Sequence, residues 1–132
     1  MIQHPVMTLE DAKRVAAAAR LEAERNGWRV VVAVVDDGGH LMYLERMDGA
    51  QKASSKIAEE KGRTAIMFKR PTKAIEDVVL SGRIVMMELP GAVPLEGGLP
   101  LIVDGQYVGG IGVSGVQSFQ DGVIAQAGAA VL

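Results

Sequence analysis

The sequence predicts an α+β fold in which helices pack on an antiparallel sheet of about five strands. Two apolar runs, Leu99–Val103 and Tyr107–Val113, flank Asp104-Gly105, and this dipeptide between apolar runs is the strongest short-range signal for a β-hairpin. A second pair of runs, Trp28–Val35 and His40–Arg46, flanks a Gly-rich turn and predicts a second hairpin. Hairpins build antiparallel sheet, and helical patterns before, between and after them supply the cover.

Two of the expected helices carry start signals. The first begins at Thr8, where Thr8-x-x-Asp11 has the spacing of a capping box, and it ends at Asn26-Gly27, because glycine suits the left-handed cap of a helix. Its small apolar residues recur every three or four positions, which would let the helix lie close to a sheet. The last helix is expected after Ser118-x-x-Asp121, a second capping-box pattern.

The middle of the chain predicts two further helices and an extended segment. A long helix covers about Gln51–Phe68 and is stopped by Pro71, because the residue before a proline is pushed out of the helical region. Thr72 is expected to cap a short helix that runs to about Leu80. The segment Arg83–Leu89 is interpreted as an extended piece that adds the fifth strand.

Length and composition bound the class of protein. A chain of 132 residues is expected to form one domain, here residues 1–132. The formal net charge is −2 and the basic residues are scattered, which gives no sign of a nucleic-acid partner. Cysteine is absent, which excludes disulfides and thiolate chemistry. No apolar run reaches membrane length and Met1–Met7 lacks the apolar core of a signal peptide, so we expect a cytoplasmic protein without a membrane partner.

Two features predict a homo-oligomer, most simply one built from dimers. Apolar residues make up 48% of the chain, and small domains this apolar often bury further surface between subunits. Gly109, Gly110 and Gly112 stand inside a predicted strand, where glycine marks a close approach by other backbone or by a ligand. We expect tight helix or subunit packing at these glycines rather than a ligand.

Several short motifs occur in order along nearly the whole chain, and their order and spacing are more specific than any one of them. They are Val34-Val35-Asp36-x-Gly38-Gly39-His40-Leu41, Arg46-Met47-Asp48-Gly49-Ala50, Lys69-Arg70-Pro71-Thr72, Gly109–Gly115, Gln120-Asp121 and the tail Ala127-Gly128-Ala129-Ala130. Together they resemble the GlcG/HbpS-like proteins, the group that includes the C-terminal domain of PduO-type corrinoid adenosyltransferases.

The resemblance implies a profilin-like fold, in which a five-stranded antiparallel sheet lies between helices. It also implies homo-oligomers, octamers in some members, and haem or another tetrapyrrole as a possible ligand, because some members bind one. Other members stand in operons for small-molecule catabolism without a settled activity. The adenosyltransferase activity of PduO belongs to a different domain and is not implied for this chain.

His40 is the first candidate for chemistry, since it follows the turn Asp36–Gly39 at the start of a strand. Gly38 and Gly39 lack side chains and would let a ligand approach the imidazole. His40 is interpreted either as an axial ligand of haem or as a general acid or base. The alternative is a structural imidazole that hydrogen-bonds to Asp36 or to backbone. The chain's other histidine, His4, lies on the N-terminal tail, and no spacing predicts a metal site.

Lys61 is the one charged residue on the apolar face of its predicted helix. It either extends its ammonium to the rim of the core, which is the commoner outcome, or points it into a pocket as an anion partner or a catalytic base. Arg46 and Arg70 are candidate clamps for carboxylates or haem propionates, because guanidinium binds carboxylate in a bidentate manner. The alternative for both arginines is a solvated or intersubunit salt bridge.

The stretch Glu96-Gly97-Gly98 leads into the Leu99–Val113 hairpin and is a candidate ligand-binding loop, because Gly-rich loops at sheet ends often carry sites. Glu96 is either a carboxylate base there or an ordinary solvated side chain. Ser114 and Ser118 stand in no nucleophile motif, so a hydrolase triad is not predicted.

The sequence leaves three functions open. The leading interpretation is an oligomeric protein that binds a small ligand, best guessed as haem or another tetrapyrrole. The second is an enzyme that moves a proton on a small carboxylic acid, of the lyase or isomerase type, with His40 or Lys61 as the base and Arg46 or Arg70 as the clamp. The third is an accessory protein without a ligand of its own. A pocket on which histidine, lysine and arginine converge would favour the enzyme.

Overall fold

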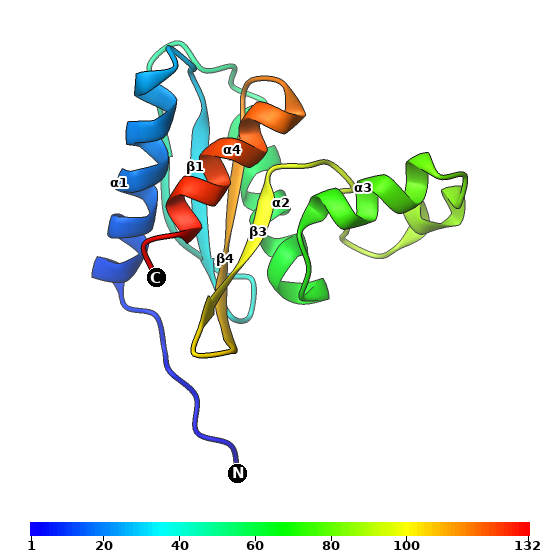
Figure 1. Cartoon of the computed structure of the whole chain (residues 1–132), viewed down its shortest axis with the longest axis horizontal. Coiled ribbons are helices and arrows are strands. Elements are labelled where there is room, and N and C mark those ends of the chain that lie inside the picture. Colours follow the sequence, from blue (N-terminus) through cyan, green and yellow to red (C-terminus); the bar gives the residue numbers. More distant parts are fainter.

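A computed structural model describes all 132 residues and contains one antiparallel sheet of four strands in the order β2-β1-β4-β3 (Figure 1). The strands are β1 (Val31–Asp36), β2 (Leu41–Arg46), β3 (Gly98–Val103) and β4 (Gln106–Ser114). Both predicted hairpins are confirmed, since β1 pairs with β2 and β3 with β4. Asp104 and Gly105, the two turn residues between β3 and β4, have φ values of 50° and 77°, as a type I′ turn requires.

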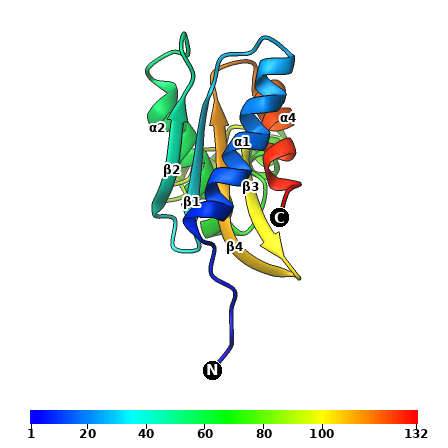
Figure 2. The same ribbon diagram turned by 90° about the vertical axis from the view of Figure 1, so that its left-hand side faces the viewer.

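Helices cover both faces of this sheet (Figure 2). α1 (Leu9–Arg25) and α4 (Ser118–Ala129) pack together on one face, and α2 (Ser54–Phe68) packs on the other. The main core lies on the α1 and α4 side and includes Val30, Val32 and Val34, whereas Val31 and Ala33 face α2. The α+β class and the cover on both faces are therefore as expected.

The predicted fifth strand is wrong. The segment Arg83–Leu89 contains instead a short 3₁₀ helix, η1 (Ile84–Glu88), which packs against α3 (Thr72–Leu80). α3 and η1 form an arm that leaves the body of the molecule and returns at Gly98 (Figure 1). A strand needs a partner for its backbone N–H and C=O groups, and the segment Ile84–Glu88 pairs with no strand of the sheet.

The glycines of β4 are explained by α2, which lies directly on that strand. A Cβ added at Gly112 would collide with the carbonyl oxygen of Ala58, and one added at Gly110 would collide with the carbonyl oxygen of Gly62. Backbone of the helix thus touches backbone of the strand, and only glycine leaves the space. The expectation of tight helix packing is confirmed at these two positions.

Three caps show how far local patterns hold. Thr8 and Asp11 form the predicted capping box of α1, with hydrogen bonds in both directions. The capping box predicted at Ser118 is wrong, because Gln117 and Gln120 form it. Thr72 does not cap α3 either: Pro71 occupies that position, and the Thr72 hydroxyl instead accepts a hydrogen bond from the N–H of Gly98 at 2.9 Å.

Candidate functional site

The turn between β1 and β2 is built around the carboxylate of Asp36. Its Oδ1 accepts hydrogen bonds from the backbone N–H groups of Gly38 and His40, each at 2.9 Å. Burial by itself would raise the pKa of Asp36, but these two hydrogen bonds, helped by the imidazole of His40, lower it below its ordinary value of 3.8. Asp36 is therefore a carboxylate that the turn holds ionised and in a fixed orientation.

The imidazole of His40 lies on this carboxylate and is otherwise free. Its Nδ1 is 3.3 Å from Asp36 Oδ1, its side chain is 82% exposed, and Nε2 has no partner. His4 differs, because its Nδ1 lies 3.1 Å from Gln106 Oε1 and its Nε2 lies 3.1 Å from Asp37 Oδ2. Of the two histidines, His40 is the one with a ring nitrogen available to a ligand.

Gly38 and Gly39 give the neighbouring side chains room to lie against the turn. A Cβ at Gly38 would sit 2.9 Å from His40 Cε1. Gly39 has a φ of 80°, and a Cβ there would sit 2.9 Å from Arg63 Cγ. The two glycines thus allow the imidazole of His40 and the stem of Arg63, which comes from α2, to approach the same turn.

Lys61 takes neither of its predicted positions. It is buried between α2, β4 and α4, where its Nζ lies 3.1 Å from Asp121 Oδ2 and donates a hydrogen bond to the Val113 carbonyl at 3.0 Å. Burial raises the pKa of Asp121, and the charge of Lys61 opposes this rise. The ammonium is therefore neutralised inside the protein, and it lines none of the four cavities that the structure contains.

The glycines at Gly97 and Gly98 pack around this ion pair. Gly97 has a φ of 131°, and a Cβ there would lie 2.6 Å from the Val113 carbonyl oxygen and 2.8 Å from Lys61 Nζ. A Cβ at Gly98 would collide with the carbonyl oxygen of Lys61. Glu96 is half-buried, and its backbone N–H donates to the Glu76 carboxylate at 3.3 Å. This loop closes over the ion pair, so its glycines have a packing role.

The two candidate arginines lie in separate hollows. Arg46 is exposed and lines a cavity of about 490 Å³ at one end of the sheet, together with Arg20, Arg29 and three acidic residues. Arg70 lines another cavity, of about 370 Å³, beside the end of α2. Neither cavity includes His40 or Lys61. The structure thus does not bring the proposed bases and the proposed clamps into one pocket.

Sequence reasoning missed Asp121 as the partner of Lys61, because its spacing from Ser118 matched a capping box. It also missed Lys69, whose Nζ lies 5.5 Å from the centre of the Tyr107 ring. Lys69 has a φ of 52°, in the left-handed region where glycine or asparagine is usual at the end of a helix. Pro71 was the available signal for this position, since proline commonly follows such a cap.

A model of the family described as "Haem degrading protein HbpS-like" matches residues 7–130. This chain belongs to the HbpS-like family. Protein GlcG of Escherichia coli strain K12 is 44% identical over 109 residues, which make up 83% of this chain and 81% of GlcG. The resemblance to GlcG/HbpS-like proteins is therefore confirmed.

Two solved structures share the fold of this HbpS-like chain. A double mutant of HbpS from Streptomyces reticuli superimposes with a TM-score of 0.91 at 38% identity, covering 100% of this chain and 90% of the other. The structure described as a PduOC:heme complex superimposes with a TM-score of 0.87 at 32% identity, covering 97% and 96% of the two chains. No cluster of His, Asp and Glu suited to holding a bare metal ion is present, and no helix is long and apolar enough to cross a membrane.

Proposed function

We propose that this HbpS-like protein binds haem, or a closely related tetrapyrrole, with His40 as the axial ligand. The observation that carries the proposal is the orientation of this imidazole, which holds Nδ1 on the Asp36 carboxylate and leaves Nε2 free and exposed. A carboxylate on the far nitrogen fixes the tautomer and orientation of a metal-binding histidine and raises its basicity. Neutral imidazole is a common axial ligand of haem iron.

The relatives support haem over other ligands of imidazole. The family description names haem-degrading proteins, and the related PduOC structure is a complex with heme. The HbpS and PduO structures share the fold of this chain and are 38% and 32% identical to it in sequence. Because the porphyrin ring is largely apolar and His40 lines none of the four cavities of the single chain, the proposal also needs an apolar covering face from outside this chain.

Arg63 is the cation best placed to meet a propionate. Its side chain lies against Gly39 and also approaches Gly91, and it has no carboxylate partner. Lys61 has less support for this role, because its ammonium is paired with Asp121. Arg46 is at the opposite end of β2 from His40, and a strand of six residues spans roughly 20 Å.

The test is a titration with haem followed by its Soret band. We expect a saturable shift in the wild type and in His4→Ala, the matched control, and loss of ligation in His40→Ala with the oligomer size unchanged. Binding should also be lost on acidification, since a protonated imidazole cannot ligate iron. Wild-type spectra in His40→Ala would contradict His40 as the ligand, and absence of saturable binding in the wild type would contradict the function.

The enzyme with a His40 or Lys61 base receives less support from this arrangement. Proton transfer needs the base and the anion clamp within reach of one substrate. The two candidate bases differ in environment, since the His40 side chain is 82% exposed and Lys61 is buried. Neither residue lines a cavity with Arg46 or Arg70.

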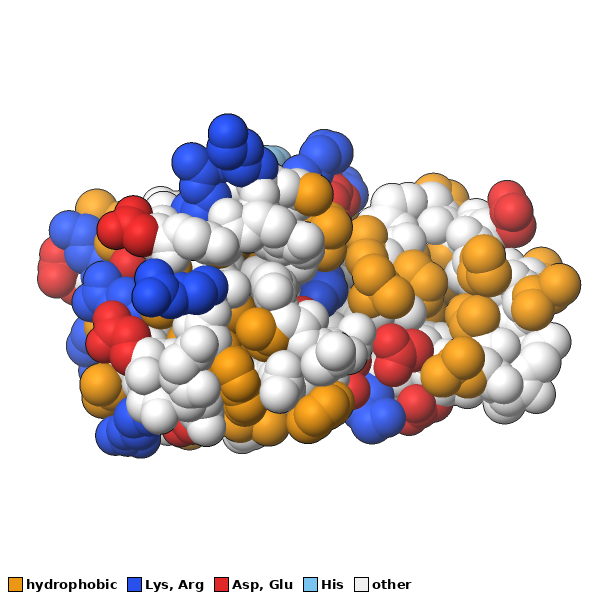
Figure 3. All heavy atoms as spheres, turned by 90° about the horizontal axis from the view of Figure 1, so that it is seen from above, with side chains coloured by type: hydrophobic (Ala, Val, Ile, Leu, Met, Phe, Trp, Pro, Cys, Tyr) orange, Lys and Arg blue, Asp and Glu red, His pale blue; other side chains and the backbone are white.

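We further propose that the protein works as a homo-oligomer. The arm formed by α3, η1 and the loop that follows them exposes several large apolar side chains: Leu80, Ile84, Val85, Met87 and Leu95. Figure 3 shows several hydrophobic side chains gathered over the arm, with white atoms between them. An exposed apolar patch on a projecting arm is typical of a surface that another protein covers, and a second copy would also supply the covering face for haem.

A further inference from the structure

The hollow beside Arg70 differs in its charge balance from the other cavities that arginines line, around Arg46 and around Arg14. It lies between the end of α2, the β3–β4 hairpin and α4, and measures about 370 Å³, within the range of small-molecule sites. Lys69 and Arg70 are its only charged residues, and no Asp or Glu lines it. The hollow around Arg46, by contrast, sets three arginines against Glu24, Glu45 and Asp48.

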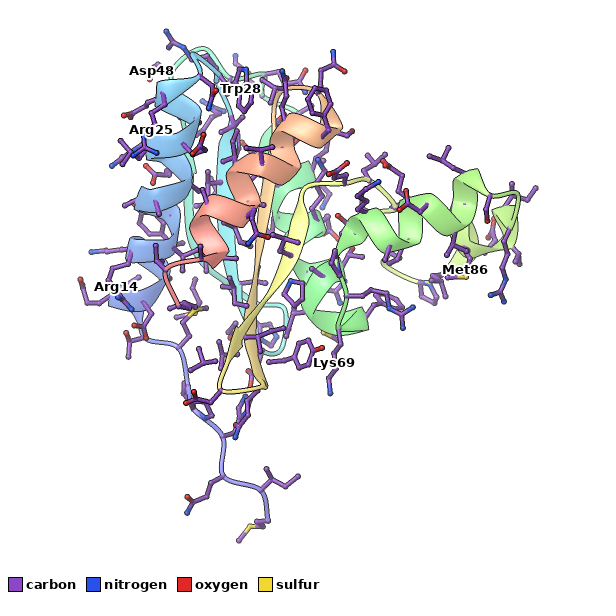
Figure 4. The ribbon with its side chains drawn as sticks, in the orientation of Figure 1. Arg14, Arg25, Trp28, Asp48, Lys69 and Met86 are labelled. Carbon is purple, nitrogen blue, oxygen red and sulfur yellow. The ribbon has the colours of Figure 1, made fainter.

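Lys69 is held at this hollow by its backbone. Its left-handed φ of 52° ends α2, where its N–H donates to the carbonyls of Ala65 and Ile66. This conformation turns the side chain toward the hairpin (Figure 4), so that Nζ lies 5.5 Å from the centre of the Tyr107 ring. Non-glycine residues rarely adopt this conformation, and where they do the position is worth examining for function.

The guanidinium of Arg70 is held in place by a hydrogen bond to the backbone, and it has no acidic partner. Its Nε donates a hydrogen bond to the Phe68 carbonyl at 3.0 Å, which leaves the terminal N–H groups of the guanidinium free. Neither Lys69 nor Arg70 belongs to any of the molecule's ion pairs. Two neighbouring cations without a carboxylate, in a chain of net charge −2, form an unmatched positive site.

The rest of the lining is apolar or aromatic. Leu99 and Ile102 come from β3, and Tyr107 from β4 presents its ring to Lys69. A ligand that matches this lining has an anionic head for the cations and a flat or branched apolar body for the strands. Guanidinium and carboxylate pair well because their geometries are complementary.

We propose that this hollow binds a small carboxylic acid with an apolar or aromatic body, held by Lys69 and Arg70 at its head and by Tyr107 along its body. The site is separate from His40, which lines neither this hollow nor the neighbouring one where Lys69 and Tyr107 meet Asp37 of the β1–β2 turn. It is distinct from the sequence-based enzyme hypothesis as well, since it requires neither His40 nor Lys61.

The probe is 3-phenylpropionate, with neutral 3-phenylpropanamide as the matched control compound. Titrated into the ¹⁵N-labelled protein, the acid should give saturable shifts of the amide signals of Lys69, Arg70 and Tyr107, which weaken as salt is added. The amide should give no comparable shifts. Equal shifts with both compounds, absence of saturation, or shifts confined to another cavity would overturn the proposal.

Lys69→Asn removes the ammonium while keeping a residue that tolerates the left-handed conformation, and Lys69→Gly does the same with no steric cost. Both variants should fold and bind the acid roughly tenfold more weakly or worse, as expected for loss of one charge-assisted contact. Lys56→Asn, an equal charge change at the exposed start of α2, should bind normally. Unchanged affinity in the Lys69 variants, or loss of assembly in place of loss of binding, would overturn the site.

Discussion

The ion pair between Lys61 and Asp121 is enclosed, with each side chain 3% exposed. Removing two charges from water is costly, and only good geometry with further hydrogen bonds repays it. Here the ammonium also donates to the Val113 carbonyl, and the other oxygen of Asp121 accepts from the N–H of Val116. The ion pair thus links α2, β4 and α4 to one another. Lys61, the charged residue on the apolar face of its helix, therefore has a structural role.

We expect Lys61→Met to lower the free energy of unfolding at neutral pH by about 3–5 kcal/mol, because it leaves a buried carboxylate unpaired. Adding Asp121→Asn should restore part of this loss. Since burial raises the pKa of Asp121 above 3.8, the penalty should be smallest below that pH and grow as the pH rises through the folded-state pKa. Urea unfolding at several pH values measures this, and equal stability of Lys61→Met and wild type would contradict it.

Asp36 is expected to behave in the opposite way. Its folded-state pKa lies below 3.8, so the stability that it gives the turn is present above pH 3.8 and is lost as the pH falls through the lower folded value. The amide signal of Gly38 should therefore titrate with a midpoint below 3.8, and Asp36→Asn should abolish that titration. A midpoint at or above 3.8 would show that the turn does not favour the ionised carboxylate.

Individual elements show where local sequence is enough. The Asp-Gly turn and the Thr8 capping box depend on residues within a few positions of each other, and both were predicted. Asp121 has the same local signal as Asp11, yet it binds Lys61, which is sixty positions away. The apolar pattern of Ile84–Glu88 suits a strand, but a strand forms only where the fold places the segment along a sheet edge so that it can pair. Such outcomes depend on tertiary packing that no short window of sequence contains.

Only the part of the candidate site that depends on local sequence could be predicted. Asp36 and His40 are neighbours in sequence, and their contact follows from the Gly-rich turn between them. Convergence of Arg46, Arg70 and Lys61 required a particular tertiary arrangement, and the structure places them in three different environments. Residue type indicated suitable chemistry at each position, but the positions of these side chains relative to one another were decided by packing.

The contact between α2 and β4 gives a prediction at the scale of the element. Gly110→Val should lower the free energy of unfolding by roughly 1–3 kcal/mol, as is typical of overpacking, because its side chain would meet the Gly62 carbonyl oxygen. Gly105→Asn is the matched control, since that turn glycine has open space around it and a φ of 77° that asparagine tolerates. Unchanged thermal melting and oligomer size in Gly110→Val would show that helix and strand do not touch there.

At the scale of the whole molecule, the arm is the feature that the chain alone does not explain. It extends from the body without contributing to the sheet, and Ile84 and Met87 on it are 69% and 59% exposed. Isolated exposed apolar residues are common, but several large ones gathered on a projecting element are unfavourable in water unless something covers them. A second copy of the chain is the simplest cover, and interfaces of this kind persist on dilution because they resemble a core cut in half.

We therefore expect the wild type to scatter light as an oligomer at micromolar concentration, and the double variant Ile84→Glu with Met87→Lys to dissociate. These two changes cancel in charge, so only apolar contact is lost. Leu9→Lys with Leu21→Glu is the matched control, because both leucines are exposed on α1 to a similar extent, 48% and 49%. A monomeric wild type would refute the oligomer, whereas dissociation of the α1 control with an intact arm variant would place the interface on α1 and leave the arm for a different partner.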